Sequence, residues 1–188
     1  MIYDLPKNVE INGRTYEINT DFRCILDIFE VLNDTELNDR ERAFLALGFF
    51  YPNLAEMPKE DVTKAQEKLL WFIRGGSDEE PKRGESLVSW EHDFPYIIAP
   101  INRNAGHDIR QDAYVHWWSF LAYYMEIGES VFSQIISIRS KRASGKKLDK
   151  AEKERYMKNK HLVDVHKVEK YSRAELDFFK QFGGENNG

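Results

Sequence analysis

The sequence predicts a mainly α-helical protein, a bundle of about six to seven helices with an N-terminal β-hairpin. Apolar residues recur at helical spacing through most of the 188-residue chain. Ser, Asp and Asn stand where these segments would begin, and Gly or Pro where they would end. The clearest alternating pattern is confined to residues 9–18. With 41% hydrophobic residues, the chain has enough apolar surface to form a sizeable core.

The hairpin is predicted from the segment VEINGRTYEI. Four apolar residues alternate with polar ones around Asn12-Gly13: Val9, Ile11, Tyr16 and Ile18. Asn-Gly favours the two positive φ angles of a type I′ turn, the usual two-residue hairpin connection. Because two strands alone are marginally stable, we expect the hairpin to pack on the helices that follow.

Three helices are predicted after the hairpin, within residues 19–34, 37–51 and 57–76. Thr20 or Asp21 can cap the first. Asn38 and Glu41 have the spacing of a capping box at the start of the second. The third has a proline in its first turn and ends at two consecutive glycines. A polar loop is predicted over residues 77–86.

Further helices are predicted in the second half of the chain. The segment 89–104 contains Pro95 and Pro100, so we expect its helix to be kinked or to start late. Helices are also predicted in 113–128, 129–142, 148–162 and 171–182, the last capped by Ser172, before a frayed end. For domains, we predict a hairpin-and-helix core in residues 1–140. Residues 141–188 are predicted to form a basic helical extension that packs on the core or trails from it.

The segment AYVHWWSFLAYYM, residues 113–125, contains seven aromatic or imidazole side chains. Projected as a helix, it places both tryptophans on one face and His116, Phe120 and Tyr123 on the opposite side. A helix that is apolar nearly all round is typical of the centre of a bundle. The alternative interpretation is that His116, Phe120 and Tyr123 form a second stripe that binds a partner protein.

No pattern in the sequence indicates catalysis, a metal site or a cofactor. The five histidines lack the spacing of metal ligands, and there is no nucleophile elbow and no glycine-rich phosphate loop. The single cysteine, Cys24, excludes an internal disulfide, and its apolar helical setting favours a buried, unreactive thiol. No apolar run approaches the ~20 residues of a membrane span, and the N-terminus lacks the features of a signal peptide. We therefore expect a soluble protein that is not an enzyme.

The charge distribution is uneven. The whole chain carries a net charge of −5, but residues 141–170 contain eleven Lys or Arg against five Asp or Glu. Such a segment could neutralise nucleic-acid phosphates, through a basic patch of Lys141, Arg142, Lys146, Lys147 and Lys150. It lacks the interleaved aromatic residues of a base-stacking platform, so a solvated helical face is the favoured interpretation. A third interpretation is contact with an acidic protein partner or with a second copy of the chain.

Several blocks, in this order, resemble the bacteriophage Gp15 family of siphophage and prophage tail modules: MIYDLP, VEINGRTYEINTDFR, YVHWWSFLAYY and IISIRS before a Lys-rich region. Members of that family lie close to the tape-measure gene. The resemblance implies a tail assembly chaperone, a non-catalytic protein that coats the tape-measure protein in the cytoplasm of the bacterial host and is absent from the finished virion. It implies no catalytic residues and no cofactor.

The partners expected from the resemblance are the tape-measure protein and other phage tail proteins, together with a possible homo-oligomer. Two other functions remain open on the sequence. One is a nucleic-acid-binding accessory protein that uses the basic segment, although the net negative charge disfavours nucleic acid as a partner. The other is a structural tail or connector subunit that stays in the particle.

Overall fold

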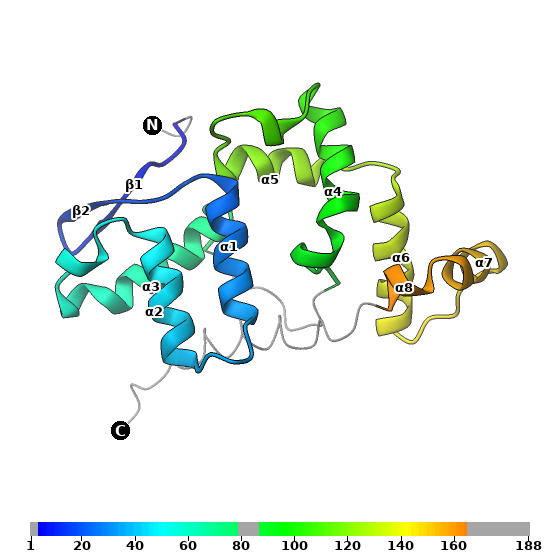
Figure 1. Cartoon of the computed structure of the whole chain (residues 1–188), viewed down its shortest axis with the longest axis horizontal. Helices are drawn as coiled ribbons and strands as arrows, with labels where there is room; N and C mark the ends of the chain where they lie inside the picture. Colours follow the sequence, from blue (N-terminus) through cyan, green and yellow to red (C-terminus); the bar gives the residue numbers. More distant parts are fainter. Residues whose placement is uncertain (1–3, 79–86, 165–188) are drawn as a thin grey trace. The chain divides into compact units, whose positions relative to one another are not determined.

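The computed structural model describes residues 4–78 and 87–164, which form two compact units. Of the described residues, unit 1 contains 4–78 and 112–121, and unit 2 contains 87–111 and 122–164 (Figure 1). This division differs from the predicted boundary after residue 140, because the chain leaves unit 1, forms part of unit 2 and returns. The predicted helix 171–182 and most of the predicted loop 77–86 lie outside the described residues.

Unit 1 begins with the predicted hairpin, formed by β1 (Asn8–Ile11) and β2 (Arg14–Glu17). The turn residues Asn12 and Gly13 have φ angles of 50° and 78°, which confirms the type I′ turn. The antiparallel register pairs Val9 with Tyr16 and Ile11 with Arg14. Val9 and Ile11 are buried, so one face of β1 contributes to the core of unit 1.

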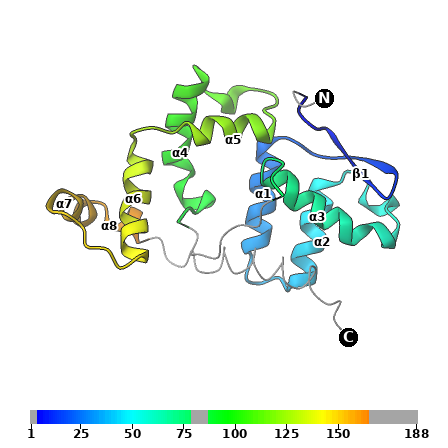
Figure 2. The same ribbon diagram turned by 180° about the vertical axis from the view of Figure 1, so that it is seen from behind.

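The helices of unit 1 are α1 (Phe22–Asn33), α2 (Asp39–Phe50) and α3 (Val62–Ile73), followed later in the chain by the first half of α5 (Trp117–Met125). Two short 3-10 turns, Leu54–Glu56 and Lys59–Asp61, connect α2 to α3. Asp21 caps α1, and Asn38 with Glu41 forms the predicted capping box of α2. Figures 1 and 2 both show α1 and α2 side by side.

Unit 2 contains α4 (Trp90–Ala105), a 3-10 turn at Ile109–Gln111, the second half of α5, α6 (Val131–Ala143), α7 (Lys150–Lys158) and α8 (Lys160–Val163). The helix α4 is capped by Ser89 at its start, continues through Pro95 and Pro100, and has Gly106 as its C-cap. The expectation of a late start is therefore wrong. Each proline removes one backbone N–H, yet packing of Ile97, Ile98 and Ile101 in the core stabilises the helix around them.

A buried ion pair holds unit 2 together. The guanidinium of Arg139 on α6 donates to both carboxylate oxygens of Asp93 on α4, at 2.6 and 2.9 Å. It also donates to the carbonyl oxygens of Leu87, Leu162 and Val163. All five N–H groups of Arg139 are therefore used, which offsets the cost of burying the charge. The contacts to Leu162 and Val163 fix α8 against α6, so the described part of the predicted C-terminal extension packs within unit 2.

Candidate partner-binding surfaces

The aromatic segment 113–125 is only partly helical, because α5 begins at Trp117 rather than at Ala113. The preceding residues are extended and pair with the start of α1. The Phe22 N–H donates to the Val115 carbonyl at 3.0 Å, and the Trp117 N–H donates to the Thr20 carbonyl at 2.7 Å. The helical projection of residues 113–116 was therefore wrong. A backbone pairing with residues about 95 positions away competes with helix formation and leaves no periodic signal in the sequence.

His116 occupies the cap position of α5. Its Nδ1 accepts a hydrogen bond from the Trp118 N–H at 3.0 Å, and its Nε2 lies 3.0 Å from the Pro6 carbonyl oxygen. This pair of partners requires a neutral imidazole with the proton on Nε2. Burial lowers the pKa of His116 below its usual value of 6.5, which favours the same neutral form. His116 therefore acts as a structural N-cap in unit 1.

The two adjacent tryptophans close the C-terminal end of α3. The indole N–H of Trp117 donates to the Ile73 carbonyl, and that of Trp118 donates to the Phe72 carbonyl, both at 2.9 Å. Carbonyls in the last turn of a helix have no i+4 partner within the helix. The Trp117 indole satisfies that of Ile73, and the Trp118 indole adds a second donor to the Phe72 carbonyl, which also accepts from the Gly75 N–H at 3.0 Å. Gly76 lies directly beside Trp118, and a Cβ atom at this glycine would stand 2.8 Å from the indole ring. The Trp-Trp pair and the glycines after α3 are thus one packing feature.

The predicted stripe of His116, Phe120 and Tyr123 is not an exposed surface. His116 and Phe120 are 3% and 0% exposed. Phe120 stacks on Phe22 and on Trp117, with ring centroids 4.8 and 5.4 Å apart. Tyr123 lies in unit 2 and is half-buried. The partner-binding interpretation therefore lacks the exposed face that it requires at His116 and Phe120, and the core interpretation of this segment accounts for both residues.

An exposed apolar face lies instead on α2, where the sequence analysis identified only a capped helix. We call it the α2 face, consisting of Phe44, Leu45, Gly48 and Phe49. Phe44 is 67% exposed, Phe49 40% and Leu45 38%. Apart from its own helical turn and chain neighbours, no atom of residues 4–78 and 87–164 lies within 4 Å of where a Cβ atom would stand at Gly48. These four positions are spaced at i, i+1, i+4 and i+5, so they lie on one side of the helix.

The opposite side of α2 is also apolar. Because that side packs on the core, the α2 face is left exposed to solvent. Ala43, Ala46, Leu47 and Phe50 are buried against the rest of unit 1. A helix that is apolar on both sides needs two partners, and the described part of unit 1 covers only one of them. An available signal in the sequence was the run AFLALGFFY, whose apolar residues exceed what one buried stripe needs.

The predicted basic patch is partly neutralised inside unit 2. Lys141 pairs with Glu152, and Arg142 pairs with Asp164 while stacking over the Tyr156 ring. Their partners lie on or next to the short helices α7 and α8, so these ion pairs help to attach those helices to α6. Lys146, Lys147 and Lys150 are exposed. Three of the five predicted lysine and arginine side chains therefore make no ion pair within the described residues.

Other polar clusters have structural partners. Asp61 is fully buried and accepts hydrogen bonds from the side chains of Tyr16, Asn12 and Arg14, and these bonds lower the pKa of its carboxyl group. Burial raises the pKa of the Cys24 thiol to about 12, so the thiol stays protonated at neutral pH. In residues 4–78 and 87–164, no three His, Cys, Asp or Glu side chains are grouped to hold a metal ion. Within the same ranges, no helix combines the length and apolar character that crossing a membrane requires.

Comparison with known proteins gives one match. The sequence model of a family described as Bacteriophage Gp15 protein matches residues 1–165. This range includes the hairpin, both units as described and the aromatic segment. No curated protein and no solved structure matches the chain.

Proposed function

The chain belongs to the bacteriophage Gp15 protein family, and from this premise we propose that it is a tail assembly chaperone that binds the tape-measure protein during tail morphogenesis. On this proposal the protein has no catalytic activity and acts in the cytoplasm of the bacterial host. Its partner is a long helical protein with an apolar face, which would aggregate if that face stayed exposed to water. The chaperone covers the face until tail-tube subunits replace it.

The observation that carries the proposal is the α2 face. Phe44 and Phe49 project from a helix that is fixed by a capping box at one end and by core packing along its other side. Leu45, Gly48 and Phe49 are spaced at i, i+3 and i+4 on α2, and the glycine leaves a depression between the two apolar side chains that a side chain of a facing helix can enter. A helix of the tape-measure protein can therefore dock along α2 through its apolar residues.

The size of the α2 face suits reversible binding. Three exposed apolar side chains form a small contact, and most of their burial energy is offset by the cost of association. Each chaperone therefore binds weakly, and a long tape-measure protein is covered by many copies bound side by side. Weak individual contacts allow tail-tube subunits to displace the copies one after another.

The two alternative functions have less support. A nucleic-acid accessory would rely on Lys146, Lys147 and Lys150, since Lys141 and Arg142 are paired within unit 2. Three lysines give a shallow dependence of affinity on salt and weak binding at physiological ionic strength. A structural subunit of the tail would have the same surfaces, and mass spectrometry of purified virions separates it from a chaperone, which should be absent.

The test is co-expression with the tape-measure protein of the same phage. We expect the tape-measure protein to be soluble and to co-purify with the wild-type chain. The double variant Phe44→Ser/Phe49→Ser should lose both effects. The matched control is Val131→Ser/Met157→Ser, which also removes two exposed apolar side chains, but from unit 2. If the tape-measure protein is equally soluble without the chain, or if both double variants behave alike, the proposal is wrong.

A further inference from the structure

The outer edge of β2 has free hydrogen-bonding groups. The Ile18 N–H donates to the Lys7 carbonyl at 3.1 Å, so in this antiparallel register the backbone groups of Arg14, Tyr16 and Ile18 point toward β1. The backbone groups of Thr15 and Glu17 must then point the other way. Both residues are exposed, and no partner for these groups is present in residues 4–78 and 87–164. One row of donors and acceptors on β2 is therefore available to another strand.

This free edge ends at α2. Asn19 is the next residue whose backbone points away from β1, and its N–H already donates to the Phe50 carbonyl at 2.8 Å. Its side-chain amide donates to the Phe49 carbonyl at 2.5 Å. A segment that pairs with Thr15 and Glu17 is therefore short, because its pairing cannot continue to Asn19. A short edge of this kind binds a short extended peptide rather than a whole sheet.

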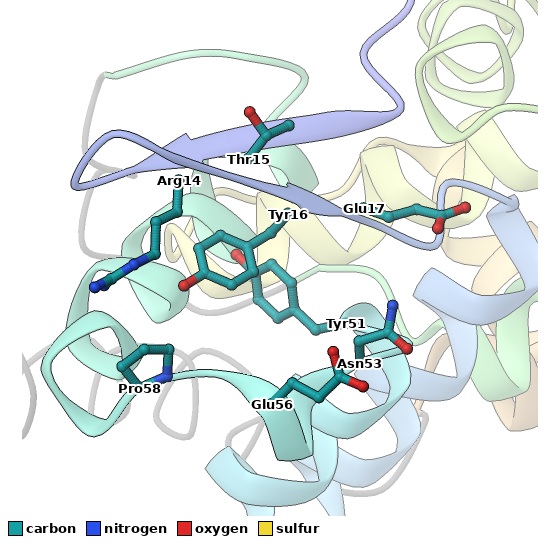
Figure 3. A pocket seen from close by; sticks show the side chains of 8 residues that line it. All are labelled: Arg14, Thr15, Tyr16, Glu17, Tyr51, Asn53, Glu56 and Pro58. Carbon is teal, nitrogen blue, oxygen red and sulfur yellow. The ribbon is translucent and has the colours of Figure 1, made fainter.

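A pocket of about 320 Å³ lies along the same edge, between β2 and the connection from α2 to α3 (Figure 3). Tyr16 and Tyr51 meet edge to face in it, with ring centroids 6.3 Å apart. The Tyr51 hydroxyl donates to the Ala65 carbonyl and the Tyr16 hydroxyl donates to Asp61. Because both hydroxyls are bound to unit 1, the two rings are held in place. Tyr51 is buried behind Tyr16, so the half-buried Tyr16 ring is the aromatic surface that faces the pocket.

The charges around the pocket favour a cation. Its lining contains one cation, Arg14, whose guanidinium is paired with Glu60 and Asp61 at 3.0 Å each. The lining also contains Glu17 and Glu56, which are exposed and make no ion pair within the described residues (Figure 3). Two unpaired carboxylates beside two tyrosine rings form an environment that attracts an ammonium or guanidinium group.

We propose that the free edge of β2 binds an extended segment of a partner polypeptide, which adds as a third strand and places a Lys or Arg side chain in the pocket beside Glu17, Glu56 and the two tyrosine rings. Backbone pairing with Thr15 and Glu17 provides affinity that is independent of sequence. The pocket provides the preference for a basic residue. This site lies on the hairpin and not on the α2 face, so the proposal of a strand-binding site is tested independently of the proposed chaperone function.

The first test uses fluorescein-labelled pentapeptides and fluorescence anisotropy. The probe is Thr-Val-Lys-Val-Thr with blocked ends, and its control replaces Lys by norleucine, which has the same length without the charge. We expect the lysine peptide to bind several-fold more tightly. In Glu17→Gln/Glu56→Gln this preference should disappear, whereas Glu30→Gln/Glu36→Gln, which removes two exposed carboxylates of unit 1 outside the pocket lining, should keep it.

The second test addresses the strand edge. Thr15→Pro removes an outward N–H without touching the bonds to β1, so it should weaken both peptides about tenfold. Glu10 faces Thr15 across the hairpin and points its own backbone outward from β1, so Glu10→Pro is the matched control and should leave binding unchanged. Thermal unfolding checks that both variants fold. Equal binding of the lysine and norleucine peptides, or equal effects of the two proline variants, would overturn the proposal.

Discussion

Two aromatic-rich helices of unit 1 have opposite environments. The start of α5 carries Trp117, Trp118 and Phe120, and Trp117 and Phe120 are buried. The helix α2 carries Phe44 and Phe49, which are exposed. In the sequence, the first was the candidate for a partner surface, as an alternative to a core helix, and the second was identified only as a capped helix. The comparison shows that residue type does not decide exposure, because burial depends on whether a neighbouring element can satisfy and cover the side chain.

The partners of each side chain explain the difference. The two indole N–H groups of α5 donate to carbonyl oxygens at the end of α3. The indole rings also pack on rings of α1 and α3, among them Phe29 and Phe72. Phe44 and Phe49 lie on the side of α2 opposite to the one that packs on the described part of unit 1, where Phe50 is buried. Trp117 and Phe120 belong to the core because neighbouring rings cover them, whereas the rings of Phe44 and Phe49 remain exposed and available for a partner.

The largest predicted effect is on stability, and it separates the two helices directly. Trp117→Ala removes a buried indole and its hydrogen bond to Ile73, so we expect a loss of about 3–5 kcal/mol in the free energy of unfolding. Phe44→Ala should change it by less than about 0.5 kcal/mol. Urea unfolding followed by circular dichroism measures both. Similar losses in the two variants would show that the α2 face is covered in the folded protein.

The next largest effect on stability is expected at Gly76, which packs against Trp118 of α5. Gly76 has a φ of 86°, and a Cβ atom there would clash with Trp118. We therefore expect Gly76→Ala to destabilise the protein by about 1–3 kcal/mol. A thermal melt in comparison with wild type measures this loss. A neutral result would mean that Trp118 moves away freely and that the packing at the end of α3 is loose.

A smaller effect is expected at the cap of α5. His116→Ala removes the acceptor for the Trp118 N–H and should cost about 1 kcal/mol. Because the folded-state pKa of His116 is lowered, its contribution is present above the unfolded pKa of about 6.5 and is lost as pH falls through the window below it. His116→Asn keeps a cap oxygen and does not titrate.

The pH dependence of His116 is tested by urea unfolding of wild type and His116→Asn at pH 7 and pH 5. The stability of wild type relative to His116→Asn should decrease from pH 7 to pH 5. An unchanged difference between the two proteins would contradict the assignment of His116 as a neutral cap.

The smallest effect is a gain. Gly48 lies in the last turn of α2 with no contact that requires a glycine, so Gly48→Ala should stabilise the protein by up to about 0.5–1 kcal/mol. The same variant fills the hole between Leu45 and Phe49. If the α2 face docks a helix of the tape-measure protein, Gly48→Ala should raise the melting temperature and weaken co-purification. If Gly48→Ala raised both the melting temperature and the amount of co-purified tape-measure protein, partners would not approach α2 at this point.

Local features of the fold were predictable from the sequence. The type I′ turn at Asn12-Gly13, the caps at Asp21, Ser89 and Asp149 and the capping box of α2 all follow from residues a few positions apart. Such signals are reliable because a cap or turn involves only neighbouring backbone groups. The helical class follows from the same short-range periodicity.

The contacts that joined distant residues were not predictable. The ion pair of Arg139 with Asp93 spans 46 positions, and neither residue stands out among the many charges of the chain. The pairing of Val115 and Trp117 with the start of α1 also has no local signature, and it places His116 at the start of α5 as its cap. The pocket beside β2 likewise requires the hairpin to lie against the α2–α3 connection.

The sequence by itself determined the elements of this protein, since hairpin, helices and most of their ends are set by short-range hydrogen bonding and periodicity. It also carried the resemblance to the Gp15 family, which the match over residues 1–165 confirms. Only the tertiary structure decided which aromatic residues are core and which are surface. A helix that is apolar on two sides can bury either one, and the choice depends on neighbours that the fold brings from elsewhere in the chain.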